Sequence, residues 1–195
     1  MRSAEVKRQT KETNIKIKIN LDHSGKPQIT SKIGFLNHML ETFAHHSLFE
    51  INADIKGDLH VDQHHLIEDT GITFGEAFKK ALGNKRGIKR TGFFVYPMDE
   101  ALAMVVVDIS GRPFLKMDAK FKRKRVGDFD IDTLEDFFRG FVTSLCATLH
   151  LRVYYGRSDH HKIESIFKAF GKAMKDACAM EPRMRNRIPS TKGKI

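Results

Sequence analysis

The chain has 195 residues, of which 41% are hydrophobic, and its formal net charge is +10. This length allows one buried core, or two small duplicated halves that share one. No apolar run approaches the roughly 20 residues of a membrane-spanning helix, and the N-terminal residues lack the apolar core of a secretion signal. We therefore expect a cytoplasmic protein with no membrane partner.

The first half of the chain shows both the strand period and the helical period. Ile15, Ile17 and Ile19 alternate with polar residues, which predicts a half-buried strand. Turn residues follow, so we expect the next short segment, 28–32, to return as the partner of this strand. The remaining patterns predict a helix over 35–46, a strand over 49–55 and a helix over 64–82.

A similar order recurs in the second half. Apolar patterns predict strands over 92–96, 101–109 and 114–120, a helix over 134–149, a strand over 151–155 and a helix over 161–180. Such an order predicts an α+β domain made by duplication, with both helix pairs packed on sheet faces. We expect a single domain over 1–195, with halves at about 1–88 and 89–183 and a basic C-terminal tail.

The motif His-His-x-x-Glu occurs once in each half, at 64–68 and 160–164, with 160 − 64 = 96 residues between the copies. At roughly 100° per helical residue, the three side chains share one face, while the adjacent imidazoles diverge enough to reach different ions. A single copy is as easily a solvated helix face as a ligand set. Two copies in equivalent places favour a paired metal site, and this ligand mixture suits Mn, Fe, Zn or Ni.

The positive charge predicts an anionic partner, and two basic clusters are candidates. Residues 120–125 form the densest run, for which a solvated strand or loop is the simpler interpretation and nucleic-acid binding the alternative. The second cluster surrounds the segment 189–193, whose hydroxyl and ammonium groups suit a small phosphate. Cys146 and Cys178 fall in apolar helical stretches without metal spacing, which favours buried free thiols.

Several segments together resemble the imidazoleglycerol-phosphate dehydratase family. The resemblance covers essentially the whole chain in order and is carried by residues 33–40, 57–62, 64–65, 68–71, 97–102, 108–113, 159–164 and 189–193. It implies a lyase of histidine biosynthesis that dehydrates imidazoleglycerol phosphate to imidazoleacetol phosphate. It also implies a duplicated ferredoxin-like fold, in which each half is a mostly antiparallel sheet packed with two helices, and a 24-subunit shell with active sites between subunits.

The resemblance further implies two Mn(II) ions per active site. The implied ligands are His38, His64, His65, Glu68, Asp136, His160, His161 and Glu164. Asp136 aligns roughly with His38 in the duplicated order, where many relatives have a histidine. The ions would grip the ring nitrogens of the substrate and stabilise an imidazolate, which expels hydroxide to give a diazafulvene-like intermediate. Asp62 and Asp159 are further candidates to orient ligand imidazoles.

The remaining roles also follow from the resemblance. The implied catalytic residues are Glu12, His65 and Glu164, and the implied substrate or phosphate contacts are Glu12, His38, His46, Arg90, Arg112, Lys168, Ser190, Thr191 and Lys192. From the sequence alone, Glu12 reads as a charge at a strand edge. Lys168 lies four residues after Glu164, so the two share a helix face. The rival hypotheses are a basic nucleic-acid-binding α+β module and a non-catalytic metal-dependent shell protein.

Overall fold

Alternating buried isoleucines give the first sheet its apolar inner face. In the computed structural model, which describes residues 1–195, Ile15, Ile17 and Ile19 are fully buried while the residues between them face solvent. The strand order of this sheet is β1-β2-β4-β3. Its strands are β1 (Ser3–Gln9), β2 (Thr13–Asn20), β3 (Gln28–Thr30) and β4 (Glu50–Gly57).

The second sheet repeats this plan with the order β5-β6-β10-β7. In each sheet one strand pair is parallel and the other two pairs are antiparallel, so both sheets are mostly antiparallel as expected. A small hairpin of β8 (Arg125–Val126) and β9 (Phe129–Asp130) was not expected. The strands of the second sheet are β5 (Thr91–Met98), β6 (Ala101–Asp108), β7 (Phe114–Asp118) and β10 (Thr148–Tyr155).

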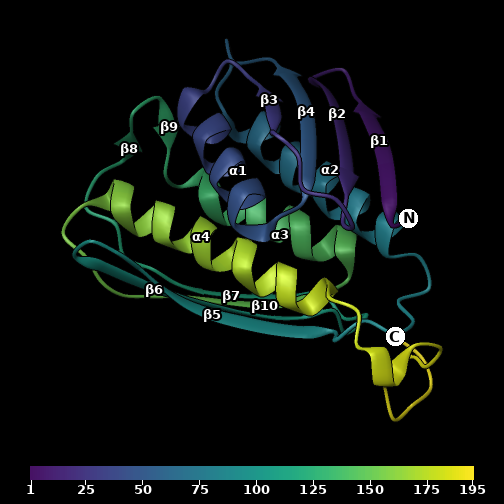
Figure 1. Ribbon diagram of the computed structural model, residues 1–195. Helices are drawn as coiled ribbons and strands as arrows, with labels where there is room; N and C mark the ends of the chain where they lie inside the picture. The colour runs from purple at the N-terminus through teal and green to yellow at the C-terminus, as the bar shows by residue number, and fades with distance from the viewer.

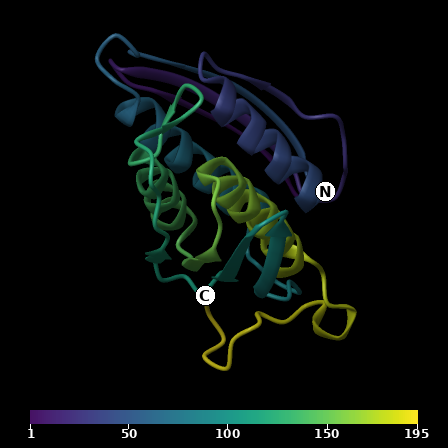
Figure 2. The ribbon, with the colours of Figure 1, turned by 90° about the vertical axis from the view of Figure 1, so that its left-hand side faces the viewer.

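All four long helices lie between the two sheets (Figure 1). They are α1 (Gly34–Ser47), α2 (His64–Leu82), α3 (Thr133–Leu145) and α4 (Asp159–Cys178). The arrangement crosses the two halves, because α1 packs against α4 and α2 packs against α3 (Figure 2). Each helix pair therefore takes one member from each half of the chain.

The contact between α2 and α3 is close because glycines line it. A Cβ atom added at Gly71 would lie 2.1 Å from the carbonyl oxygen of Phe137, and one at Gly140 would lie 2.8 Å from that of Glu68. Real side chains do not approach so closely, so only glycine allows this helix separation. Phe74 and Phe141 fill the space beside the glycines, with ring centroids 5.8 Å apart. The close contact fixes α2 and α3 relative to each other.

Two of the predicted elements differ from the structure. Residues 28–30 pair in parallel with β4 instead of returning against β2, because β1 and β4 already occupy both edges of β2. Only Val6 is fully buried in β1, so this strand lacks the alternation that would have revealed it. The helix expected over 134–149 ends at Leu145, because Cys146 adopts a left-handed conformation that ends the helix and lets residues 148–149 join β10.

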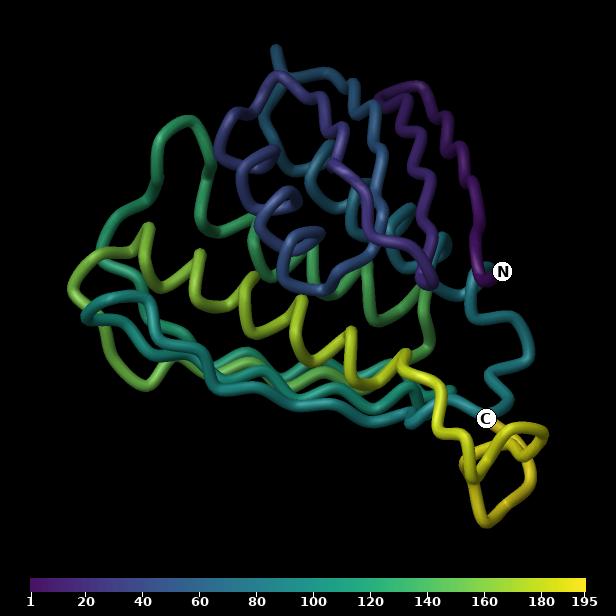
Figure 3. Tube along the Cα trace, in the orientation of Figure 1, coloured from purple at the N-terminus to yellow at the C-terminus, as the bar shows by residue number.

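The chain beyond α4 leaves the layered body. A short 3₁₀ helix, η1 (Pro182–Met184), begins this tail, which curls at one end of the molecule (Figure 3). The basic run over 120–125 is a mostly exposed loop. Both cysteines are free thiols; Cys178 is buried as expected, whereas Cys146 is half-buried. None of the helices combines the length and apolar character that crossing a membrane requires.

Candidate metal and substrate site

The first predicted ligand cluster forms where α1 meets the start of α4. His38, His160 and Glu164 each direct a donor atom to one point, and these atoms lie within 4.8 Å of one another. The Nε2 atoms of His38 and His160 are 3.8 Å and 3.3 Å from Glu164 Oε2. Such a group of imidazole nitrogens and a carboxylate has the composition and spacing of a divalent transition-metal site.

A second cluster occupies the equivalent place between α2 and α3. His64 Nε2 lies 3.6 Å from Asp136 Oδ2. Asp136 is the fourth residue of α3 and His38 the fifth of α1, so the two positions lie within one residue of the rough alignment expected. Glu68 follows His64 by one helical turn and makes no ion pair here, so its carboxylate is free to bind a cation.

The second histidine of each motif points away from the cluster that the first histidine joins. His65 Nδ1 lies 3.1 Å from Asp58 Oδ2 and 3.9 Å from Glu12 Oε2. His161 Nδ1 lies 2.7 Å from Glu100 Oε2. The predicted divergence of adjacent imidazoles is therefore present in both halves, and neither His65 nor His161 joins the cluster of its own neighbour.

Lys168 links the first cluster to a half-buried aromatic residue. Its Nζ atom lies 3.0 Å from Glu164 Oε1, as the four-residue spacing predicts, and 5.6 Å from the centre of the Tyr96 ring. The rings of His46 and Tyr96 meet edge to face, with centroids 5.1 Å apart. Tyr96 on β5 was missed by the sequence analysis, because a tyrosine in an alternating strand reads as ordinary sheet packing.

The other predicted phosphate contacts lie at the far end of α4. Arg90 forms a two-bond ion pair with Asp108, at 2.6 Å and 2.9 Å, and donates to the carbonyl of Pro189. Arg90, Ser190 and Thr191 line one open cavity of about 600 Å³. The backbone N–H of Arg90 bonds the carbonyl of Ala177, thirteen residues beyond Glu164, which is roughly 20 Å along a helix.

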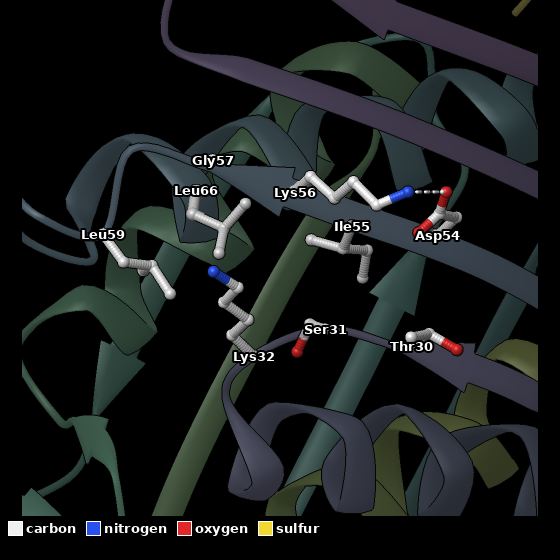
Figure 4. A pocket seen from close by; sticks show the side chains of 9 residues that line it. All are labelled: Thr30, Ser31, Lys32, Asp54, Ile55, Lys56, Gly57, Leu59 and Leu66. Atoms are coloured by element: carbon white, nitrogen blue, oxygen red, sulfur yellow. Dashed lines mark hydrogen bonds and ion pairs between the residues drawn. The ribbon is translucent and has the colours of Figure 1, made fainter.

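Within one chain, the predicted site is therefore divided. His38, His160, Glu164 and Lys168 are brought together, and so are His64 and Asp136. Arg112 and Lys192 are exposed and make no ion pair. A different cavity, of about 370 Å³, lies between the ends of β3 and β4 and the start of α2 and contains none of the predicted residues (Figure 4). No single pocket of this chain encloses the whole set.

Charges around the clusters shift several pKa values. Burial pushes the pKa of Glu164 upward, but the hydrogen bond from Lys168 and the charges of His38 and His160 outweigh it, so that pKa lies below its usual value. The hydrogen bond with Asp58 raises the pKa of His65. The hydrogen bond with His161 lowers the pKa of Glu100 to about 2. The ionised carboxylate of Glu164 favours cation binding at the first cluster.

The two aspartates expected to orient ligand imidazoles, Asp62 and Asp159, make other contacts. Asp159 forms a buried ion pair with Lys162 and accepts the backbone N–H groups of Lys122 and Arg123. Asp62 accepts the backbone N–H of His64 at the start of α2. The carboxylates that hydrogen-bond to an imidazole are instead Asp58 and Glu100, which lie in segments that carried the family resemblance.

Comparisons with known proteins agree over the whole chain. A family model described as imidazoleglycerol-phosphate dehydratase matches residues 31–174. The dehydratase of Methylobacillus flagellatus is 49% identical over 195 residues, covering 100% of this chain and 98% of its own length. That of Caldicellulosiruptor saccharolyticus is 50% identical over 192 residues, covering 98% and 97%.

Solved structures agree as well. The crystal structure of the Staphylococcus aureus dehydratase has a TM-score of 0.83 and 38% identity, covering 92% of this chain and 99% of that one. The Pyrococcus furiosus enzyme in complex with (S)-C348 has a TM-score of 0.83 and 36% identity, covering 97% and 100%. The predicted duplicated α+β fold is confirmed by these matches.

The fold and these relatives define a carbon–oxygen lyase of the hydro-lyase class. The chain belongs to the imidazoleglycerol-phosphate dehydratase family, whose members dehydrate imidazoleglycerol phosphate in histidine biosynthesis. The resemblance seen in the sequence is thereby confirmed, while the roles of individual residues stay predictions.

Proposed function

We propose that this chain dehydrates imidazoleglycerol phosphate to imidazoleacetol phosphate with two Mn(II) ions per active site. The observation that carries the proposal is the pair of imidazole–carboxylate clusters, one between α1 and α4 and one between α2 and α3, in a chain that belongs to this family. Their donor atoms fit the group, because nitrogen and carboxylate oxygen without thiolate suit Mn(II).

The proposed ligands form one set for each ion, and two further histidines belong to neither set. His38, His160 and Glu164 would hold one ion, and His64, Glu68 and Asp136 the other. His65 and His161 turn away from both clusters. We assign these two imidazoles to ions held by neighbouring copies, so that the active site lies between subunits.

Bound manganese would supply the Lewis acidity that draws electrons from the substrate's imidazole ring. The chain must then supply a proton acceptor. Glu12 is suited to this role, because its side chain is 52% exposed at the tip of the β1–β2 hairpin and its carboxylate accepts no hydrogen bond within the chain. It lies 3.9 Å from His65, so the base and a ligand share one site.

The reaction removes one water molecule. Glu12 takes a proton from the carbon that becomes the carbonyl carbon, the hydroxyl on the carbon attached to the ring leaves as hydroxide, and the proton held by Glu12 converts it to water. The resulting enol becomes the ketone. Catalysis thus needs Glu12 to move a proton while the imidazole ring of the substrate is held in a fixed position.

Basic and hydroxyl groups would bind the phosphate. Lys168 is close to the first cluster, whereas Arg90, Ser190 and Thr191 gather at the other end of α4. Arg112 and Lys192 are exposed. A small substrate cannot span roughly 20 Å of helix. We therefore propose that phosphate groups of one site come from more than one copy, in a 24-subunit cytoplasmic shell.

The activity is tested with purified, Mn(II)-loaded protein and imidazoleglycerol phosphate, by following the keto product. We expect turnover by the wild type and a fall in kcat of about 100-fold or more in Glu12→Gln, since positioned acid–base groups contribute about that much. Glu41→Gln, an exposed carboxylate on α1 without an ion pair, is the matched control and should keep full activity.

The rival is a basic nucleic-acid-binding module. If loaded wild type forms no keto product and instead binds RNA tightly at moderate salt, the dehydratase proposal is wrong. Equal kcat for Glu12→Gln and wild type would leave the activity standing and remove Glu12 from the role of base.

A further inference from the structure

A carboxylate of the same chain holds the second histidine of each motif. We propose that Asp58 and Glu100 are positioning residues that hold His65 and His161 with Nδ1 protonated and Nε2 turned outward for a metal ion. This inference rests on the proposed function, because it concerns ligands of the same site. Neither carboxylate belongs to the ligand set, and each acts through its imidazole.

The geometry is the same in both halves. Asp58 Oδ2 lies 3.1 Å from His65 Nδ1, and Glu100 Oε2 lies 2.7 Å from His161 Nδ1. An ionised carboxylate only accepts hydrogen bonds, so it selects the tautomer in which Nδ1 carries the proton. The lone pair is then on Nε2, which is also the nitrogen that His38, His64 and His160 direct into the two clusters. A carboxylate behind the ligand fixes the ring and strengthens it as a donor.

The side chain of Asp58 has no hydrogen-bond partner besides His65. Its Oδ1 atom is buried without any hydrogen bond, and the only hydrogen bond of Oδ2 is with His65. A buried carboxylate oxygen without a hydrogen-bond partner costs free energy, and neither carboxylate oxygen of Asp58 accepts a backbone N–H. The contact with His65 is thus the only hydrogen bond that the side chain of Asp58 makes in this chain.

The carboxylate of Glu100 makes more hydrogen bonds than that of Asp58. Its Oε1 atom accepts the backbone N–H groups of Arg157 and Ser158, at 3.1 Å and 2.8 Å, just before α4 begins. The second oxygen therefore has little freedom and stays on His161. The tip of the β5–β6 hairpin is in this way fixed to the start of the helix that carries the second motif.

The two halves assign this role to different elements. In the duplicated order, the β1–β2 hairpin that carries Glu12 corresponds to the β5–β6 hairpin that carries Glu100. In the second half the hairpin acid holds the imidazole, whereas in the first half Asp58, which follows β4, does so. Glu12 is thereby left unbound, 3.9 Å from His65. Because Asp58 holds the imidazole in the first half, Glu12 is the only one of the two equivalent hairpin acids that is available to move a proton.

A rival explanation is that Asp99, Glu100 and His161 form a metal site of their own, since their donor atoms also lie within 4.8 Å of one another. Against it, Asp99 is 73% exposed and 4.0 Å from His161. Both oxygens of Glu100 already accept hydrogen bonds. The nitrogen that faces this acidic group is Nδ1, whereas Nε2 faces away from it.

Glu100→Gln tests the proposal with little change of shape. The amide oxygen is expected to keep the two backbone hydrogen bonds, because an NH₂ group there would face two N–H donors. The NH₂ group must then face His161 Nδ1, which selects the tautomer with the proton on Nε2. In protein with ¹⁵N-labelled histidine rings, solid-state NMR of the metal-free form should show His161 protonated at Nδ1 in wild type and at Nε2 in the variant. His161→Asn identifies the signals.

Manganese titration provides the second measurement. Glu100→Gln should weaken Mn(II) binding about 10- to 100-fold at half of the sites, as expected for loss of a group behind a ligand. Asp58→Ala should weaken the other half by a similar factor. Asp99→Asn, the adjacent acid, should change neither the tautomer nor the affinity.

An unchanged His161 tautomer in Glu100→Gln would overturn the proposal. So would an equal loss of affinity in Asp99→Asn and Glu100→Gln, which would make the acidic group a metal site itself. A protein that shows the expected tautomers and affinities but forms no keto product would overturn the proposed activity and leave the positioning role standing.

Discussion

His46 shows how a single residue responds to its surroundings. Its ring lies at the end of α1 against Tyr96, and partial burial, with the charges of His45, Lys168 and Lys172, lowers its pKa to about 4. The imidazole is therefore neutral in the folded protein at pH 7, and it can accept or donate one hydrogen bond near Lys168.

This pKa predicts a pH dependence of stability. Between about pH 4 and the ordinary histidine pKa of 6.5, the unfolded chain binds a proton at His46 that the folded chain does not. The free energy of unfolding should therefore fall as the pH is lowered through this window. His46→Gln should reduce that slope, measured by urea unfolding of metal-free protein at several pH values. Identical slopes in both proteins would contradict the lowered pKa.

At the scale of single residues, the sequence predicted the metal-donor side chains better than the carboxylates that hydrogen-bond to their imidazoles. The motif and its repeat indicated His64, His160 and Glu164 because helical spacing alone places such residues on one face. Asp58 and Glu100 reach their imidazoles from a loop and a hairpin tip, and no local period relates those segments to a helix. Their discovery required the folded chain.

Among the elements, the pair α2 and α3 sets the geometry of the second cluster. His64 and Asp136 face each other only because glycines let the two helix backbones approach closely. The position of a metal ligand thus depends on residues that never touch a metal.

Gly71→Ala tests this dependence. Its Cβ would lie 2.1 Å from the carbonyl oxygen of Phe137, so the helices must separate, and we expect a loss of about 1–3 kcal/mol or more in the free energy of unfolding. Gly34→Ala is the matched control, since its Cβ meets only a side-chain oxygen at 3.4 Å and should change stability by less than about 0.5 kcal/mol. Urea unfolding of metal-free protein measures both. Equal stabilities would show that α2 and α3 move apart without cost.

Periodicity predicted all four helices but not their ends or their partners. The helix expected to reach residue 149 ends at Leu145, because a left-handed Cys146 has no signature in an apolar sequence. The pairing of 28–30 was wrong because β1 has only one fully buried residue and gave no sign that it occupies the edge of β2. Burial patterns show which face of an element is covered, but not what covers it.

For the whole molecule, the incomplete sites within one chain predict that metal binding and assembly are coupled. His65 and His161 turn away from the two clusters of their own chain, and the proposed function assigns them to ions held by other copies. An ion shared between copies stabilises the contact between them, because binding to the assembled form shifts the equilibrium toward it.

Light scattering before and after chelation measures this coupling. We expect the particle to become smaller when metal is removed, to regain its size with Mn(II), and to stay small with Ca²⁺, which prefers sites built from oxygen ligands alone. An unchanged particle size after chelation would show that metal does not hold the assembly together.

The crossed helix pairs have a consequence for how the halves depend on each other. Each cluster combines side chains from both halves, His38 with His160 and Glu164 in one and His64 with Asp136 in the other, so neither half can form a cluster alone. A polypeptide of one half would have to find a second copy in solution to build the same sites. The covalent link between α2 and β5 replaces that encounter with a high effective concentration of one half around the other, which keeps the two intrachain clusters formed even in very dilute protein.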